Sequence, residues 1–542
     1  MLYLLGLSLA IRHVNGPMNQ ICDLLLSLFS YQVMVHRNRF DGPSSCDVIK
    51  MAHISNLEII KEHLTENTNN PTCISWDIRR SNLGGRGLFA TKFIEKGSLI
   101  FTNKPLVMGP RADRSQDNFC STCFQISDTC VFCEKCSLMV CCEDCRTSGH
   151  AQKCEFISSN WKFDQNSENK SQFIARILIY LECLLLSNQQ LEIFFQLQKS
   201  DSSNVDWAEL KNLIPENTIP EDQIKLITIC SEIIKINSFR ISNHSQKKMV
   251  PLRALYPMSA FLNHSCIPNT RNEFGDDYTM SVYASKDIKV EEEIVSCYTG
   301  LLWCTPARRI QLYKTKGFWC KCDRCFDSTE MGTRLSALRC LNKECIGVLL
   351  PVTPLDPRCD WRCDNCEVLE PPARVNMVQG VLGSLVATLD LDNHLQLETF
   401  VLERLAVLIP YTNHIFVDLR LRLALKLGFA DDLKLTELSE SRLSLKESLC
   451  RGTLRTVAAL GAGDAHLRGL LLYHLHAALA ERARRRPDLY EELKPEIEST
   501  IEQAYNILHG DVSAPPDLEL RRRYLGPGCD KPQEERFFIL DA

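Results

Sequence analysis

The sequence has no excess of charge of either sign, and this limits the partners it is expected to bind. Among 542 residues, 62 lysines and arginines stand against 67 aspartates and glutamates, a formal net charge of −5. Proteins that hold nucleic acid through its phosphates carry a strongly basic face, so direct nucleic-acid binding is not expected. The one basic run, residues 482–486, follows an apolar stripe and predicts a solvated helix end rather than a binding patch.

Long hydrophobic runs are also missing. The amino-terminal stretch MLYLLGLSLAI is apolar for about ten residues, half of what a membrane-spanning helix needs, and no basic region precedes it. A membrane span and a secretory signal are therefore not expected, and residues 1–72 are predicted to be an extension of unassigned role. With 45% apolar and 24% charged residues the chain has the balance of a soluble globular protein. Its length allows about three to four domains.

Cysteine, in contrast, is abundant. The chain has 27 cysteines, and most of them lie between Cys120 and Cys366. Disulfide-rich scaffolds are usually short secreted domains. Thiols repeatedly spaced two residues apart in a long chain indicate zinc sites in a reducing compartment instead.

The hydrophobic period changes along the chain. Residues 84–107 and 278–288 alternate apolar and polar side chains, which predicts short strands joined by tight turns. Residues 171–198 and 221–236 carry apolar side chains about four apart, the pattern of amphipathic helices. After the two prolines at 371–372 the same spacing dominates, which favours stacked antiparallel helices.

The segment from 120 to 154 has no long apolar run, so metal is expected to replace a hydrophobic core there. It contains eight zinc-ligand side chains in four closely spaced pairs, enough for two tetrahedral sites. Chance clustering of buried thiols is the alternative, but it requires four correctly spaced pairs to coincide. Cys130 and Cys142 are spare, and Cys142 competes with Cys141 as a ligand. The predicted ligands are Cys120, Cys123, Cys133, Cys136, Cys141, Cys145, His150 and Cys154.

Two further cysteine groups follow. Cys320, Cys322 and Cys325 supply three ligands, so a closed structural site needs a fourth from elsewhere in the chain. A later group has two closely spaced pairs and predicts a zinc ribbon, with Cys359 as an alternative ligand. Its ligands are predicted to be Cys340, Cys345, Cys363 and Cys366.

Three separated segments carry recognisable chemistry: Gly85-Arg86-Gly87, then Asn263-His264-Ser265-Cys266, then Tyr298 in IVSCYTG. Taken alone, the first predicts a hairpin turn and Tyr298 a packed strand residue. In this order they resemble the SET-domain methyltransferases. With a cysteine finger after the first strands they resemble the SET-and-MYND (Smyd) family. The later zinc ribbon and the helical segment RGLLLYHLHAAL look most like its arthropod branch.

The resemblance, which runs from about residue 75 to about residue 530, implies an α+β fold with a β-rich SET domain. The implied parts are a SET N-terminal part at 73–119, a MYND zinc finger at 120–154, a helical SET insert at 155–248, a SET catalytic core at 249–305, a post-SET segment at 306–330, a zinc ribbon at 331–372 and an all-α, TPR-like C-terminal domain at 373–542.

The same resemblance implies roles for single residues around S-adenosylmethionine. Asn263, the His264 backbone and the small residues Gly85 and Gly87 beside Arg86 would hold the cofactor, because glycine lets a ligand approach the backbone. Phe318 would stack on the adenine and Phe239, in Asn-Ser-Phe, would line the lysine channel. Tyr298 would contact the cofactor and orient the amine for methyl transfer by positioning. Cys266 would be the fourth zinc ligand beside Cys320, Cys322 and Cys325. In the finger, Cys120, Cys123, Cys141 and Cys145 would hold one ion, and Cys133, Cys136, His150 and Cys154 the other.

The chain also departs from the family pattern. The gaps before the fifth finger ligand and before its histidine are shorter than usual, which bears on a peptide-binding groove and not on the metal sites. Val290 leads into Glu291-Glu292-Glu293 where relatives have a glycine, which predicts a different turn before Tyr298. Lys316 stands where relatives often have an aromatic residue near the lysine pocket. A basic side chain there is expected to repel a cationic substrate or narrow specificity.

Two functions follow as hypotheses. The first is a protein-lysine N-methyltransferase acting on histone or other proteins, in transcriptional regulation, in cytoplasm and nucleus, with four bound zinc ions. The second is an interaction scaffold whose finger and helical tail recruit transcriptional co-regulators while the SET fold is inactive. Expected partners are a protein with an exposed lysine and proline-rich peptides at the finger; a monomer is expected. A DNA-binding finger is rejected, because a basic recognition helix is missing.

Overall fold

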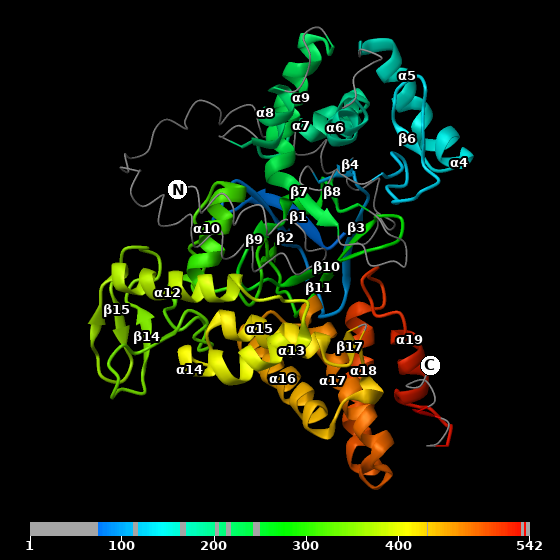
Figure 1. Cartoon of the computed structure of the whole chain (residues 1–542). Coiled ribbons are helices and arrows are strands. Elements are labelled where there is room, and N and C mark those ends of the chain that lie inside the picture. Colours follow the sequence, from blue (N-terminus) through cyan, green and yellow to red (C-terminus); the bar gives the residue numbers. More distant parts are fainter. Residues whose placement is uncertain are drawn as a thin grey trace.

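The computed structural model describes residues 74–111, 118–162, 170–200, 205–212, 218–241, 250–430, 432–532 and 536–537. The extension predicted for residues 1–72 lies outside the described residues. In Figure 1 short strands occupy the centre, with a cysteine-rich finger and helices above them and a stack of helices below. The predicted combination of α and β structure with a helical C-terminal region is confirmed.

The centre is built from three small sheets of short strands. Their orders are β1-β2-β12-β9, β10-β11-β3 and β4-β8-β7. Residues that alternate in the sequence also alternate in burial; in β11 the side chains of Met280, Val282 and Ala284 are buried. The predicted strands are therefore confirmed. The strands are β1 Trp76–Arg80, β2 Arg86–Ala90, β3 Leu99–Asn103, β4 Val107–Pro110, β7 Ser238–Ile241, β8 Leu252–Leu255, β9 Asn263–His264, β10 Thr270–Phe274, β11 Met280–Ala284 and β12 Glu293–Ser296.

Strand pairing brings the distant motifs together. β1 and β2 form an antiparallel hairpin whose turn includes Gly85 at φ 59°, a left-handed conformation that favours glycine. β12 pairs with β2 on one side and lies parallel to β9 on the other, with Val295 opposite Asn263. Tyr298, two residues after β12, therefore lies next to the Asn263-His264 segment.

The helical insert covers the outer strands. α6 (Lys170–Leu184) packs on β4, where a Cβ added to Gly109 would lie 2.8 Å from the Ile179 side chain. The single helix predicted for 171–198 is wrong at its middle: α7 (Asn188–Phe195) begins afresh at Ser187, which forms a capping box with Gln190. The remaining helices here are α8 (Val205–Asn212) and α9 (Glu221–Asn237). None of the described helices is by itself long and apolar enough to cross a bilayer; α6 and α7 pass only as a pair bent by 114°.

The cysteine-rich segments combine small hairpins with short helices. The finger contains β5 (Val131–Phe132), β6 (Met139–Val140), α4 (Glu143–Cys145) and α5 (Ala151–Asn160). After Tyr298 follow α10 (Thr305–Lys316) and α11 (Asp323–Phe326). The predicted ribbon is a four-stranded sheet: β13 Leu338–Arg339, β14 Val348–Pro351, β15 Trp361–Cys363 and β16 Leu369–Glu370.

The C-terminal region stacks helices against one another and against the sheets (Figure 1). Arg271 of β10 donates to the carbonyl of Asn506 at 3.1 Å, and Asp464 N–H donates to Ser285 O at 2.7 Å. The basic run at 482–486 lies at the end of α17 (His466–Arg485), as predicted, but Arg482 and Arg485 are partly buried and pair with Glu447 and Glu481 instead of being fully solvated. The elements are α12 Pro372–Ala387, α13 His394–Thr399, α14 Ala406–Leu408, α15 His414–Lys426, β17 Phe429–Ala430, β18 Leu433–Lys434, α16 Glu440–Ala459, α17 His466–Arg485, α18 Tyr490–Leu508 and α19 Leu518–Leu525.

Candidate active site and metal centres

The segments near residues 86, 263, 298 and 318 meet at one end of the β2–β12–β9 sheet. Asn263 Nδ2 donates to the carbonyl oxygen of Arg86 at 3.1 Å. The backbone N–H of Tyr298 donates to His264 Nδ1 at 3.0 Å. The His264 ring lies 6.1 Å from the Phe318 ring, centroid to centroid. Residues separated by more than 200 positions thus form one site.

The Asn263 amide is held by a carboxylate that sequence reasoning missed. Glu293 Oε1 accepts a hydrogen bond from Asn263 Nδ2 at 2.7 Å, and its other oxygen accepts from Ser81 Oγ at 2.8 Å. A Cβ added to Gly87 would lie 2.2 Å from Glu293 Oε1 and 2.8 Å from Asn263 Nδ2. A side chain at this position would have to displace Glu293 and Asn263 from their hydrogen bond, which explains the second glycine of the Gly-Arg-Gly motif. The acidic run was the signal available in the sequence, but it does not say which acid points inward.

Arg86 presents its backbone to the site and turns its side chain away. The guanidinium donates to the carbonyl oxygen of Gln196 and lies 5.2 Å from the centroid of the Phe261 ring. Burial lowers the pKa of Arg86 from its usual value, and Nη1 is buried with no hydrogen-bond partner among the described residues. The carbonyl, and not the charge, therefore faces Asn263.

The Tyr298 hydroxyl points at backbone. It donates to the carbonyl oxygen of Leu262, the residue before Asn263. Burial, with a smaller contribution from Glu293, raises the pKa of this phenol well above its usual value. Tyr298 thus stays protonated and supplies a fixed hydroxyl, not a phenolate base.

His264 connects Tyr298 to Cys266 through its two ring nitrogens. Burial lowers the pKa of His264 to about 4, so the ring is neutral. Because Nδ1 accepts from Tyr298, the remaining ring proton lies on Nε2, which is 3.2 Å from Cys266 Sγ and donates to it. The position of Tyr298 is thereby coupled to the position of Cys266.

The Asn-Ser-Phe element lies next to Lys316. Asn237 ends α9 and donates to the carbonyls of Gln198 and Ile233, and Phe239 packs edge-on against Tyr256 at 5.9 Å. The Lys316 amine donates to the carbonyl oxygen of Ile236 and lies 5.3 Å from the centroid of the Tyr298 ring. Lys316 therefore connects the residue before the Asn-Ser-Phe element to the Tyr298 ring.

The predicted zinc ligands come together in four groups of four, and the ligand atoms of each group lie within 4.8 Å of one another. These are Cys120, Cys123, Cys141 and Cys145; Cys133, Cys136, His150 and Cys154; Cys266, Cys320, Cys322 and Cys325; and Cys340, Cys345, Cys363 and Cys366. Among the described residues, Cys130, Cys142 and Cys359 belong to none of the groups.

The spacing inside these groups fits zinc. Zn–S bonds of about 2.3 Å in a tetrahedron place two sulfurs about 3.8 Å apart. The observed Sγ–Sγ distances are 3.6 Å for Cys266–Cys325, 3.7 Å for Cys133–Cys154 and 3.6 Å for Cys340–Cys366. A disulfide would need about 2.05 Å. All the described cysteines are free thiols.

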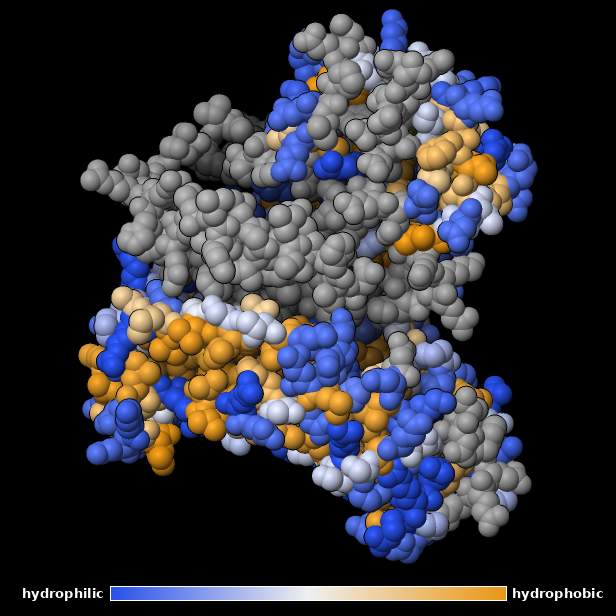
Figure 2. All heavy atoms as spheres, in the orientation of Figure 1, coloured by the Kyte–Doolittle hydropathy of each residue, from blue (hydrophilic) through white to orange (hydrophobic). Residues whose placement is uncertain are grey.

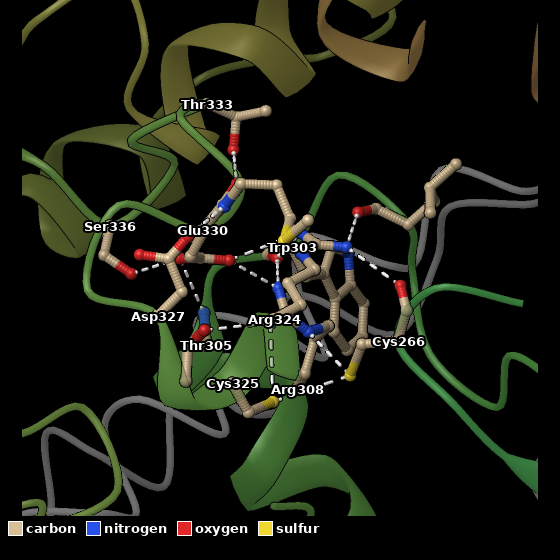
Figure 3. A network of polar contacts seen from close by, with 12 residues as sticks. Cys266, Trp303, Thr305, Arg308, Arg324, Cys325, Asp327, Glu330, Thr333 and Ser336 are labelled. Atoms are coloured by element: carbon tan, nitrogen blue, oxygen red, sulfur yellow. Dashed lines mark hydrogen bonds and ion pairs between the residues drawn. The ribbon is translucent and has the colours of Figure 1, made fainter. Parts of the chain in front are cut away.

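A buried ionic network surrounds the third group (Figure 3). Arg308 Nε donates to Cys266 Sγ at 3.1 Å, and its Nη1 is 2.7 Å from a Glu330 carboxylate oxygen. Arg324 shares that carboxylate oxygen at 3.3 Å and donates to the carbonyl of Cys266. Burial opposes ionisation of Glu330, but the two guanidiniums outweigh it and hold its pKa below the usual value. Four zinc-bound thiolates would leave two negative charges on this site, which together with Glu330 makes three, and the two arginines compensate two of them.

Comparison with known proteins shows the family of the chain. A SET domain model matches residues 85–299. The SET domain-containing protein SmydA-8, isoform A, from Drosophila melanogaster is 30% identical over 412 residues, covering 73% of this chain and 87% of the relative. The chain belongs to the Smyd family of SET-domain proteins. The likeness to an arthropod member, and the SET fold, agree with the sequence prediction.

More distant relatives match this chain over less of their length. Histone-lysine N-methyltransferase SET5 from Candida glabrata is 28% identical over 46% of this chain and 57% of its own. N-lysine methyltransferase SMYD2-A from Xenopus laevis is 26% identical over 44% of this chain and 58% of its own.

The departure at residues 290–293 from the Smyd pattern has a defined backbone consequence. Glu291 has φ 68°, a left-handed conformation that costs a non-glycine residue about 1–2 kcal/mol. Its carboxylate pairs with Arg79, but both side chains are substantially exposed and such pairs contribute little. The turn before β12 therefore places a non-glycine residue in a conformation that favours glycine, at some cost in backbone energy.

Glu291→Gly is therefore expected to stabilise the protein by about 0.5–1 kcal/mol, because glycine removes the strain but loses more backbone entropy on folding. Thermal unfolding of the two proteins measures the difference. Glu291→Ala is the matched control, since it removes the ion pair and keeps the left-handed conformation; it should not stabilise. A lower melting temperature for Glu291→Gly would show that the ion pair outweighs the strain.

Proposed function

We propose that this chain is an S-adenosylmethionine-dependent protein-lysine N-methyltransferase. The main support is the way in which Tyr298 is held: its backbone N–H donates to His264 and its hydroxyl donates to the Leu262 carbonyl. Next to it, the Asn263 amide donates to the backbone of the Gly-Arg-Gly motif. The names of two relatives, a histone-lysine and an N-lysine methyltransferase, support the same activity. S-adenosylmethionine supplies an electrophilic methyl group when it is bound.

The roles of the chain's own residues follow from their contacts. Asn263, held by Glu293, and the backbone at Gly85, Arg86 and Gly87 would hold the cofactor; the close approach of Glu293 and Asn263 to Gly87 supports this role. Phe318 would cover the adenine. The Tyr298 hydroxyl and the Leu262 carbonyl would orient the incoming amine, which must lose its proton to water before it has a lone pair to react. Positioning in a narrow site is the main contribution expected of these groups.

Four zinc ions are part of the proposal: two in a MYND finger at 120–154, one at Cys266 with Cys320, Cys322 and Cys325, and one in the ribbon at 331–372. The donor sets are thiolates and one imidazole, with no open coordination position, so the ions stabilise structure and take no part in the chemistry. The domain boundaries inferred from the sequence belong to this proposal. We also propose that the enzyme acts on histone or other proteins, in transcription, in cytoplasm and nucleus. It is proposed to be a monomer that binds neither nucleic acid nor membranes.

The interaction scaffold is the second candidate, and exposed apolar side chains favour it. Val131 and Phe132 of the finger are more than half exposed. Figure 2 shows apolar residues gathered over the ribbon and α12, where Met377 and Val381 are exposed. Such patches are typical of protein-binding surfaces. Proline-rich co-regulator peptides at the finger are the proposed ligands of this function.

Two measurements decide between the candidates. S-adenosylmethionine at 100 times its dissociation constant should stabilise the fold by about 2.7 kcal/mol, seen as a higher melting temperature. Tritiated methyl transfer to a cell lysate should be lost by at least tenfold in Tyr298→Phe, which keeps the ring and removes the hydroxyl. Tyr313→Phe, an exposed tyrosine outside the site, is the control and should retain transfer. If the wild type shows neither a thermal shift nor methyl transfer, the methyltransferase proposal fails and the interaction scaffold remains as the function.

A further inference from the structure

Lys316 ends α10 with its amine turned into the candidate active site. The side chain is partly buried, its amine donates to the Ile236 carbonyl, and the nitrogen stands 5.3 Å from the centroid of the Tyr298 ring. Ile236 directly precedes the Asn-Ser-Phe element, whose Phe239 is the proposed channel wall. The Lys316 amine therefore lies between the two elements that would flank an incoming lysine.

The charges that face Lys316 do not compensate an ammonium. Arg240 of β7 adds positive potential, His264 of β9 is neutral, and Tyr298 keeps its proton. The carboxylate of Glu293 in β12 already accepts hydrogen bonds from Asn263 and Ser81. Among the described residues no carboxylate pairs with Lys316. Burial, and then Arg240, lowers the pKa of Lys316 to about 8, although the Tyr298 ring face attracts a cation.

We propose that Lys316 is a specificity-determining residue that acts as a charge gate on the lysine channel. While protonated, it repels the ammonium of an arriving lysine; once its proton has left to water, the channel admits the amine. The gate deepens the proposed function and rests on it. It forms no bond to the substrate and takes no proton from it, so it changes access to the site and leaves the transfer step to the groups around Tyr298.

The gate predicts a ratio of rates that depends on pH. With a pKa of about 8, roughly a tenth of Lys316 is neutral at pH 7 and roughly nine-tenths at pH 9. The side chain of Lys316→Met has no charge at either pH. The initial rate of methyl transfer by this variant should therefore exceed the wild-type rate about tenfold at pH 7 and match it within about twofold at pH 9. Deprotonation of the target lysine affects both proteins equally and cancels in the ratio.

The experiment measures initial rates of tritiated methyl transfer to a degenerate peptide pool with one central lysine, at limiting peptide. Lys316→Arg keeps a charge at both pH values and should stay slow at pH 9. Lys314→Met, on the same helix, is the matched control and should follow the wild type. The S-adenosylmethionine thermal shift confirms that each variant is folded and binds cofactor.

The outcomes are separable. A Met-to-wild-type ratio that is the same at pH 7 and pH 9 overturns the gate and leaves the proposed function standing. A slower Lys316→Met at both pH values also overturns it, and would show that the amine assists the reaction. If no variant transfers methyl and none shows a thermal shift, the proposed function fails and the gate fails with it.

Discussion

Replacing Cys266 with serine is expected to lower the zinc content from four ions per chain to three and to abolish the thermal shift with S-adenosylmethionine. Structural zinc sites bind with an apparent free energy of about 10–16 kcal/mol, as much as or more than the whole stability of a typical domain. Cys266 is the one ligand of its site that comes from the sheet region and not from residues 320–325. Its sulfur also accepts a hydrogen bond from His264 Nε2, so the substitution loosens the residue that positions Tyr298.

Cys304→Ser is the matched control for this substitution. Cys304 is a buried thiol at the start of α10, close to the same ionic network, but it belongs to none of the ligand groups. Atomic spectroscopy should find four ions in the control and three in Cys266→Ser. If the variant does not fold, a chelator titration of the wild type answers the same question through the number of ions released. Four retained ions in folded Cys266→Ser would contradict the proposed site.

Arg308→Met is expected to destabilise the protein by about 3–5 kcal/mol, because it leaves Glu330 buried with only part of its charge compensated. Arg308 is fully buried and contacts Glu330, the Trp303 carbonyl, Thr305 and two zinc-ligand sulfurs (Figure 3). Differential scanning calorimetry should show a melting temperature lower by about 10 °C for the transition that contains the SET region. Zinc should also be released at a lower chelator concentration than in the wild type.

Two further variants separate the buried charge from the lost contacts. Arg308→Met combined with Glu330→Gln removes both charges and should be less destabilising than Arg308→Met alone. Arg486→Met breaks an exposed ion pair with Asp488 and should leave the transition unchanged. If the double variant is as unstable as the sum of its single substitutions, the Arg308–Glu330 interaction contributes nothing and this account of the network is wrong.

Much of the site could be predicted because metal ligands and glycine motifs are fixed by residue type and spacing. Closely spaced thiols have few other uses, so the fifteen ligands inferred from spacing fall into the four groups, and so does Cys266, which the family resemblance implied. The order of Gly85-Arg86-Gly87, Asn263-His264 and Tyr298 predicted that these segments meet, and strand pairing brings them together.

Other features could not be predicted, because they depend on which side chain of several similar ones points inward. Three consecutive glutamates have different fates: Glu291 takes a strained turn, Glu292 accepts from Asn269, and Glu293 holds Asn263. The long helix predicted after residue 170 breaks where Ser187 and Gln190 cap a new one. Hydrophobic periodicity continues across that break and hides it.

The sequence by itself determined the kinds of parts: zinc-ligand pairs, short strands around the glycine motif, a helical tail and the family to which they belong. Local chemistry fixes the first three, since ligand spacing and hydrophobic period act over a few residues, and the order of the motifs indicated the family through its resemblance. Only the tertiary structure decided that Glu293 orients Asn263, that Arg308 and Glu330 surround Cys266, and that Lys316 faces Tyr298. Those pairings join residues from separate elements. Charges and hydrogen bonds interact more strongly in the low dielectric of the protein interior, so these contacts depend on burial that only the folded chain provides.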